Sequence, residues 1–195
     1  MSAAYDAFDD PYAYKNTDVL KNKAGLRDAE LLEAFELEMT ALRADEPLPA
    51  GRYGAAHYRS LHRHLFQDVY RWAGRYRTVR TAKGGNAFCY PEHIAANMGQ
   101  LFERLRAEPF SGGATFEAFA AAAADFLAEL NAIHPFREGN GRVQLIFLHM
   151  IAVRAGHPLD MRNVEQETMI PAMVASFRGD LRLLVEELRK LRALA

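Results

Sequence analysis

The chain has 195 residues, half of them apolar and a quarter charged, and its formal net charge is −1. This size and mix suit one globular domain, and the balanced charge argues against a nucleic-acid surface, which needs a basic excess. The single cysteine, Cys89, excludes an internal disulfide and indicates a reducing compartment. The sequence has neither an apolar run of about 18 residues nor a basic leader, so we expect a cytoplasmic protein without membrane contact, although export by another route stays open.

The first expected elements are an arm and two helices. Residues 1–25 are polar and lack periodicity, which predicts an N-terminal arm, and residues 26–195 are expected to form a single domain. Leu26–Arg43 has apolar residues at intervals of three and four, with Asp28 as a candidate cap, and predicts a helix. Ala55–Arg71 has the same periodicity and predicts a second helix.

Gly74–Tyr90 differs from these segments and predicts a small hairpin. Arg75–Arg80 has strand propensity, Lys83–Asn86 has the composition of a turn, and Ala87–Tyr90 can return as the second strand. A lysine beside two glycines is, taken alone, most often a solvated turn residue.

Helices follow in the second half. Pro91 suits the first turn of a helix that buries four apolar residues at helical spacing: Ile94, Met98, Leu101 and Leu105. Phe116–Ile133 carries an apolar stripe, and Pro135 forces His134 out of the helical region, so this helix is expected to stop there. Val143–Val153 is apolar nearly all round, which predicts a central helix buried on every side.

Two C-terminal helices complete the expected architecture. Gly156 is expected to end the central helix, and Val164–Phe177 and Asp180–Leu194 predict two more, with Pro171 as a kink in the first. His149, on the central helix, is expected to be a hydrogen-bonded core residue. The fold class is therefore all-α with one β-hairpin.

The segment His134–Arg142, HPFREGNGR, carries the chemistry. It places two glycines where the central helix begins, and the first N–H groups of a helix lack partners and carry a partial positive charge. Gly139 and Gly141 let these N–H groups approach an anion, Asn140 adds an amide, and Arg142 adds a fork of donors. We expect a phosphate to bind there.

The acidic residue of the segment is explained by a metal. Glu138 would repel a phosphate unless it holds Mg²⁺, which is bound by one or two carboxylates together with substrate phosphates. His134 suits a general base near neutral pH, and Phe136 is expected to anchor the loop in the core. A G-x-G turn alone is typical of many helix caps, so the prediction of phosphoryl-type transfer depends on the combination.

Other histidines offer a weaker alternative. His57, His62 and His64 lie on one predicted helix, and His64 has the i,i+4 spacing of a metal pair with Asp68. Surface or capping histidines are commoner than metal ligands, so we expect no second metal site here.

The segment resembles the Fic-domain signature HPFx[DE]GNGRxxR, without a break from His134 through Arg142. Other parts of the chain also resemble the Fic core, so the resemblance covers nearly the whole chain; these parts are Lys15–Leu26, Leu61–Val79, Ala82–Ile94 and Val174–Asp180.

The resemblance implies a Fic-fold helical bundle with a small β-hairpin flap, and transfer of AMP from ATP to a Tyr, Thr or Ser hydroxyl of a target protein. His134 would be the general base and Glu138 the Mg²⁺ ligand. The implied nucleotide-binding residues are Phe136, Gly139, Asn140, Gly141 and Arg142. The implied flap binds an extended target segment by strand addition; its residues are Lys83, Gly84, Gly85, Asn86, Ala87 and Phe88.

Leu145 departs from the signature, which has its second arginine there. Positions 142 and 145 share a helix face, and the missing charged contact to the outer phosphates is expected to cost about 1.5–3 kcal/mol. Two alternatives follow: an enzyme that uses another nucleotide donor, or a catalytically weak protein-binding module.

Inhibition is the second expectation that the resemblance raises. The inhibitory [ST]xxxE[GN] motif of the family does not occur in these 195 residues. The chain therefore resembles the class that is restrained by a separate small antitoxin, which is a possible partner.

Overall fold

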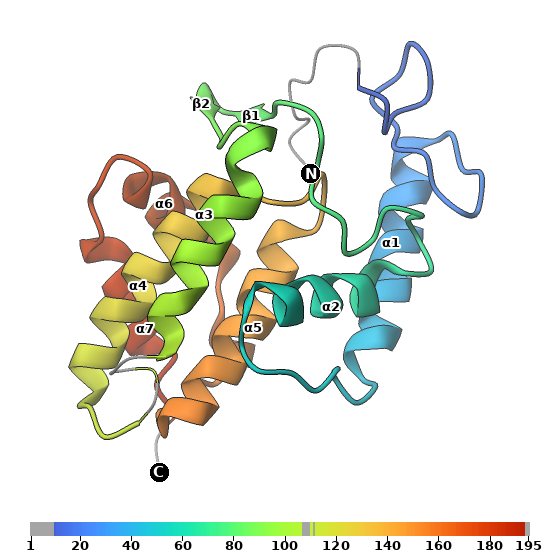
Figure 1. Cartoon of the computed structure of the whole chain (residues 1–195). Helices are drawn as coiled ribbons and strands as arrows, with labels where there is room; N and C mark the ends of the chain where they lie inside the picture. The colour runs from blue at the N-terminus through green and yellow to red at the C-terminus, as the bar shows by residue number, and fades with distance from the viewer. Residues whose placement is uncertain (1–9, 107–109, 111, 194–195) are drawn as a thin grey trace. The chain divides into compact units, whose positions relative to one another are not determined.

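The computed structural model describes residues 10–106, 110 and 112–193. This part of the chain contains seven α-helices and one two-stranded sheet, whose arrangement can be followed in Figure 1. The order is α1 (Ala29–Ala44), α2 (Ala55–Phe66), β1 (Ala82–Lys83), β2 (Asn86–Ala87), α3 (Pro91–Glu103), α4 (Phe116–Ile133), α5 (Asn140–Ala155), α6 (Gln166–Ser176) and α7 (Arg182–Lys190). The predicted all-α class with one hairpin is confirmed. No helix of the described residues is long and apolar enough to cross a membrane.

The chain forms two compact units that alternate along the sequence. The first contains the residues up to Ala95 together with Pro135–Gly139, and the second contains Ala96–His134 and Asn140–Ala195. The five-residue loop at 135–139 therefore belongs to a unit whose other residues lie far earlier in the chain. The division into an arm at 1–25 and a single domain at 26–195 stays a prediction, and residues 1–9 of the arm lie outside the described residues.

In the first unit, α1 packs against α2. The side chain of Asp28 accepts a hydrogen bond from the N–H of Leu31, so its predicted role as the cap is confirmed. The second helix ends at Phe66 instead of Arg71. Beyond it, the carbonyl of Val69 accepts a hydrogen bond from the N–H of Lys23 in the arm, and this long-range partner is invisible to helical periodicity.

The hairpin is shorter than predicted. Ala82 pairs with Ala87 and Lys83 with Asn86, and both turn glycines have positive φ, as a type I′ turn requires. The strand predicted at Arg75–Arg80 is wrong, because that segment has no neighbouring strand. Its N–H groups bond elsewhere: that of Arg77 donates to the carbonyl of Pro135, and that of Thr78 to the hydroxyl of Tyr12.

In the second unit, α4 packs against α5 and α7, and α6 packs against α7. Thr115 caps α4 by accepting the N–H of Ala118, and the apolar stripe of this helix is buried. Helix α3 begins in the first unit and ends in the second, and the four residues predicted to be buried from Pro91 onward are at most 2% exposed: Ile94, Met98, Leu101 and Leu105.

Helix α5 is not buried on every side. Val143, Phe147 and Ile151 are fully buried, whereas His149 is exposed and Val153 is 54% exposed. The prediction of a fully enclosed helix, and of His149 as a core residue, is therefore wrong. An apolar composition cannot separate an enclosed helix from one whose outer side carries isolated apolar residues.

The C-terminal helices are also shorter than predicted. Helix α7 ends at Lys190, because the next residues pair with an extended segment: Asp160 donates its N–H to Leu191, and Arg192 forms a bridge with Leu159. The predicted end at Leu194 lies outside the described residues, as does Ser111 of a predicted loop.

Candidate functional site

The segment His134–Arg142 consists of a helix end, a loop and a helix start. His134 follows the last residue of α4, and its N–H bonds to the carbonyl of Leu130 at 3.0 Å, so the predicted helix end is confirmed. Its φ of 47° lies in the left-handed region, which is uncommon for a residue other than glycine and is found often at functional sites.

The loop Pro135–Gly139 is held by buried side chains of the first unit. Phe136 is fully buried and stacks on His62, with ring centroids 3.8 Å apart. Arg137 forms an ion pair with Asp10 at 2.6 Å, in which both side chains are more than nine-tenths buried. The predicted anchoring role of Phe136 is confirmed; contact between Phe136 and a nucleotide stays a prediction.

The end of this loop is held by hydrogen bonds and requires glycine at position 139. The carbonyl of Glu138 accepts a hydrogen bond from Nε2 of His62 at 2.9 Å, and the N–H of Gly139 donates to Oε1 of Glu138 at 2.8 Å. Gly139 has a φ of 81°, and a Cβ at this position would lie 2.2 Å from Cζ of Phe66. Both the backbone angle and the neighbouring ring therefore require glycine here.

The first turn of α5 suits an anion. It begins at Asn140, contains Arg142 and has no acidic residue. A cation at a helix N-terminus is unfavourable by itself, because the helix dipole is positive there. At Gly141 an added Cβ would meet nothing within 4 Å, so the packing of the described residues does not explain this glycine. Close approach of a ligand to Gly141 stays a prediction.

The single carboxylate of the motif, that of Glu138, suits a metal that also binds phosphate. Among the described residues, no group of three or more His, Cys, Asp or Glu side chains is placed to hold a metal ion. Mg²⁺ needs no such cage, because it takes one or two carboxylates and completes its shell with phosphates and water. Glu138 supplies one carboxylate, which is a hard oxygen ligand, and the N–H of Gly139 lies beside it. A carboxylate ligand next to an N–H group suits magnesium that is bound together with a phosphate.

The weaker alternative, a metal at His64 and Asp68, is not supported. Nε2 of His64 bonds to the carbonyl of Arg43 in the last turn of α1, and the guanidinium of Arg43 pairs with Asp68 at 2.6 Å. The hydrogen bond from Arg43 holds the pKa of Asp68 below its usual value. His64 is thus a capping residue, whereas His57 and His62 are buried and not on the surface.

The flap presents an exposed turn on a fixed stem. Lys83, Gly84 and Gly85 are exposed, and the N–H of Phe88 donates to the carbonyl of Thr81, which extends the hairpin by one bonded pair. Ala82 and Ala87 face each other between two bonded pairs and therefore form the non-hydrogen-bonded pair, whose N–H groups point outward.

The family of this chain follows from its similarity to known proteins. The sequence pattern of the Fic/DOC family matches residues 53–152. The chain belongs to the Fic/DOC family. It is 50% identical over 188 residues to the probable protein adenylyltransferase y4lH of Sinorhizobium fredii, across 96% of this chain and 98% of that one. It is 36% identical over 183 residues to the probable protein adenylyltransferase Fic of Escherichia coli, across 93% of this chain and 91% of that one.

Solved Fic/DOC structures share the fold. The crystal structure of the BepC protein from Bartonella tribocorum, a VirB-translocated effector with bound AMPPNP, matches with a TM-score of 0.84 and 27% identity. The match covers 94% of this chain and 97% of that one.

Arg77 is a buried residue of this Fic/DOC chain that was not predicted from the sequence. Arg77 is 2% exposed, and its guanidinium donates to the carbonyl of Val79 at 2.7 Å and to that of Cys89 at 2.6 Å, one on each side of the flap stem. Its own N–H donates to the carbonyl of Pro135 at 2.9 Å. The only sequence signal was its place within a segment that resembles the Fic core.

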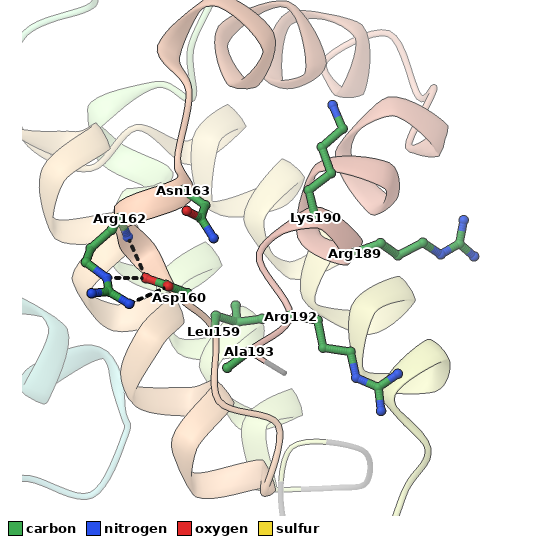
Figure 2. A pocket seen from close by; sticks show the side chains of 8 residues that line it. All are labelled: Leu159, Asp160, Arg162, Asn163, Arg189, Lys190, Arg192 and Ala193. Carbon is green, nitrogen blue, oxygen red and sulfur yellow. Dashed lines mark hydrogen bonds and ion pairs between the residues drawn. The ribbon is translucent and has the colours of Figure 1, made fainter. Parts of the chain in front are cut away.

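A hollow of about 740 Å³ in the second unit does not compete as a phosphate site. Figure 2 shows that the side chains of Arg189 and Lys190 on its rim point away from each other. Three of its four basic side chains are also paired with acids: Arg162 with Asp160, Arg189 with Glu117 and Lys190 with Glu187. The guanidinium of the fourth, Arg192, lies over the ring of Phe116, 4.7 Å from its centroid. Compensated charges of this kind give little attraction for an anion.

Proposed function

We propose that this chain transfers AMP from ATP to a hydroxyl side chain of a target protein, with the Mg-nucleotide held at residues 138–142 and His134 as the general base. Near-full-length relatives that are named protein adenylyltransferases support nucleotidyl transfer to protein as the activity. The observation that carries the proposal is the acid-free, arginine-bearing first turn of α5, which directly follows a loop fixed by buried contacts.

In this mechanism the hydroxyl oxygen of the target attacks the α-phosphorus of ATP while His134 takes the hydroxyl proton. A new bond forms between that oxygen and the α-phosphorus, the bond to the bridging oxygen breaks, and pyrophosphate leaves. The first N–H groups of α5 and the guanidinium of Arg142 stabilise the charge that develops on the phosphate oxygens. Magnesium, when bound through Glu138, would neutralise part of the phosphate charge.

The target is proposed to bind at the flap as an added strand. The outward N–H groups of the Ala82–Ala87 pair offer main-chain hydrogen bonds to an extended segment, and the exposed turn at 83–85 leaves room for it. Main-chain recognition selects an extended conformation, so side chains near the modified hydroxyl would set specificity.

Regulation and place of action are proposed from the same resemblance. A separate antitoxin is the proposed inhibitor, because the [ST]xxxE[GN] motif does not occur among the 195 residues. We propose action in the cytoplasm; the name of BepC as a translocated effector supports the alternative that this chain acts after transfer into another cell.

The test is transfer of label from α-labelled ATP to protein in a lysate. We expect magnesium-dependent labelling by the wild type, loss of at least about a hundredfold in His134→Ala, as for removal of a general base, and no loss in His149→Ala, an exposed position on α5. Equal labelling by the wild type and His134→Ala would contradict the proposal.

Leu145 favours a second candidate, a donor other than ATP. The residue is half-buried on α5, three positions after Arg142, and its side chain offers no charge to an outer phosphate. We expect Leu145→Arg to bind ATP more tightly by about 1.5–3 kcal/mol. Val153→Arg adds the same charge at an exposed position of the helix and is the control.

Competition by GTP, UTP and CTP in the labelling assay identifies the nucleotide donor. A stable complex with a target protein, without nucleotide binding, would favour the alternative of a protein-binding module.

A further inference from the structure

We propose that His62 is a positioning residue, which fixes the peptide between Glu138 and Gly139 so that the N–H of Gly139 is aimed at a phosphate oxygen of the nucleotide. The inference rests on the proposed function, because it concerns the same phosphate site. It adds a residue of α2, 76 positions before Glu138 in the sequence, to the residues that shape this site.

The hydrogen bonds of His62 define its tautomer. The N–H of Gly74 donates to Nδ1 at 2.9 Å, so Nδ1 is an acceptor and carries no hydrogen. Nε2 therefore carries the hydrogen and donates it to the carbonyl of Glu138 at 2.9 Å. The ring is fully buried and lies between Phe136 and Phe66, with centroids 3.8 and 4.7 Å away, so stacking holds the ring that makes both bonds.

The bond to the Glu138 carbonyl controls the next N–H. In a trans peptide, the carbonyl and the N–H of one peptide unit point in opposite directions. A carbonyl that faces His62 therefore turns the N–H of Gly139 away from it. In the structure this N–H donates to Oε1 of Glu138, an anionic oxygen, at 2.8 Å. A phosphate oxygen is the same kind of acceptor, and it would receive this N–H once the Glu138 carboxylate turns to a metal.

Phe66 restricts rotation of the peptide between Glu138 and Gly139. Its ring lies so close to Gly139 that a Cβ would be 2.2 Å from Cζ, so this side of Gly139 is filled and the peptide has little room to rotate. His62 supplies the polar constraint and Phe66 the steric one. Together they hold the donor in place before a ligand arrives, which reduces the entropy that binding must overcome.

His57 offers a matched control on the same helix. It is 6% exposed, its Nδ1 accepts the N–H of Tyr53 at 3.2 Å, and its Nε2 bonds to the carbonyl of Pro49 at 2.7 Å. The two histidines thus make the same pair of main-chain bonds with the same nitrogen atoms. Those of His57 hold the turn at 49–53, whereas one of those of His62 holds the motif loop.

Two substitutions of His62 distinguish the hydrogen bond made by Nε2 from the one made by Nδ1. The amide nitrogen of glutamine reproduces Nε2 of histidine, and asparagine reproduces the position of Nδ1, so His62→Gln keeps the bond to Glu138 and His62→Asn loses it. We expect Mg-ATP binding, measured by calorimetry, to stay within about threefold of the wild type in His62→Gln and to weaken about tenfold in His62→Asn. His57→Asn is expected to lower the melting temperature without changing this affinity.

A second readout needs no nucleotide. We expect the Gly139 amide to exchange its hydrogen about tenfold faster in His62→Asn than in His62→Gln, because the loss of one net hydrogen bond frees the peptide. Equal weakening by the two His62 variants, or an equal loss in His57→Asn, would overturn the inference. If His62→Asn does not fold, weakened binding in His62→Gln overturns it. Absence of Mg-ATP binding by the wild type would overturn the proposed function and the inference with it.

Discussion

The motif loop at 135–139 and the flap at 83–88 differ in how the first unit holds them. In the loop, Arg137 and Phe136 have buried side-chain partners, Asp10 and His62. The flap has strands of two residues and an exposed turn. Chemistry at a phosphate needs donors fixed to a fraction of an ångström, whereas docking of an extended segment gains from an edge that adjusts to its partner.

Glycine illustrates the same contrast. Gly139 and the flap glycines, Gly84 and Gly85, all have positive φ, but only Gly139 has a ring against its Cα; an added Cβ at the flap positions would meet nothing within 4 Å. In the loop, glycine is required by backbone and packing together. In the flap it is required by the turn alone, which leaves the surrounding space for a partner.

The largest expected effect is that of Gly139→Ala. A Cβ would overlap Phe66 and strain a left-handed residue, so we expect destabilisation by about 2–4 kcal/mol and loss of AMP transfer. Urea unfolding measures the stability. The control, Gly141→Ala, should keep or raise stability by up to about 1 kcal/mol while it weakens Mg-ATP binding. If Gly139→Ala were as stable as the wild type, the conclusion that packing and backbone angle require glycine in the loop would be wrong.

Arg77→Met tests whether the buried guanidinium supports the flap stem. The substitution takes a donor from the carbonyls of Val79 and Cys89, which is expected to cost about 1–3 kcal/mol. Labelling of target protein should fall further than Mg-ATP affinity, because the flap stem moves and the phosphate donors do not. Arg80→Met is the matched variant: Arg80 lies over the ring of Tyr90 at 4.2 Å, a contact worth about 0.5–1 kcal/mol. Equal loss of both readouts would show that Arg77 serves general stability only.

Ala87→Pro isolates strand addition at the flap. It removes an outward N–H from the non-hydrogen-bonded pair and keeps the bond from Phe88 to Thr81, so target labelling should fall about fivefold at unchanged Mg-ATP affinity, as for one lost hydrogen bond of about 1 kcal/mol. Unchanged labelling at low target concentration would contradict docking by strand addition.

The smallest effect is expected for Lys83→Ala. The side chain is exposed in the turn, and recognition by main-chain bonds does not need it, so stability should change by less than about 0.5 kcal/mol and labelling by less than about twofold. A large loss of labelling here would mean that an acidic side chain of the target is recognised as well.

Local chemistry made the helix ends predictable. Four residues were placed correctly at or beside a helix end: Asp28, Pro91, Pro135 and Gly156. Each of them starts or ends its helix through its own backbone angles or through a bond within the next turn. Those contacts extend over a few residues, so the sequence alone contains the information.

Long-range partners made the rest unpredictable. The predicted strand at 75–80 failed because Arg77 bonds to Pro135, and the buried state of His62 depends on Gly74 and Glu138. The motif named the site residues, but neither spacing nor propensity could show which side chains of α2 hold them. The exposed side of α5 was missed because composition does not tell which face of a helix has a neighbour.

The residues that hold the motif loop are all synthesised before the loop itself. Asp10, His62, Phe66 and Arg77 all precede the loop in the chain, and Asp10 lies 127 positions before its partner Arg137. A ribosome adding roughly 5–20 residues per second therefore exposes these residues for seconds before the segment that covers them exists. The first unit cannot close until residue 139 has been made, and a fragment that stops at Ala95 would leave His62 and Arg77 without the carbonyls of the loop.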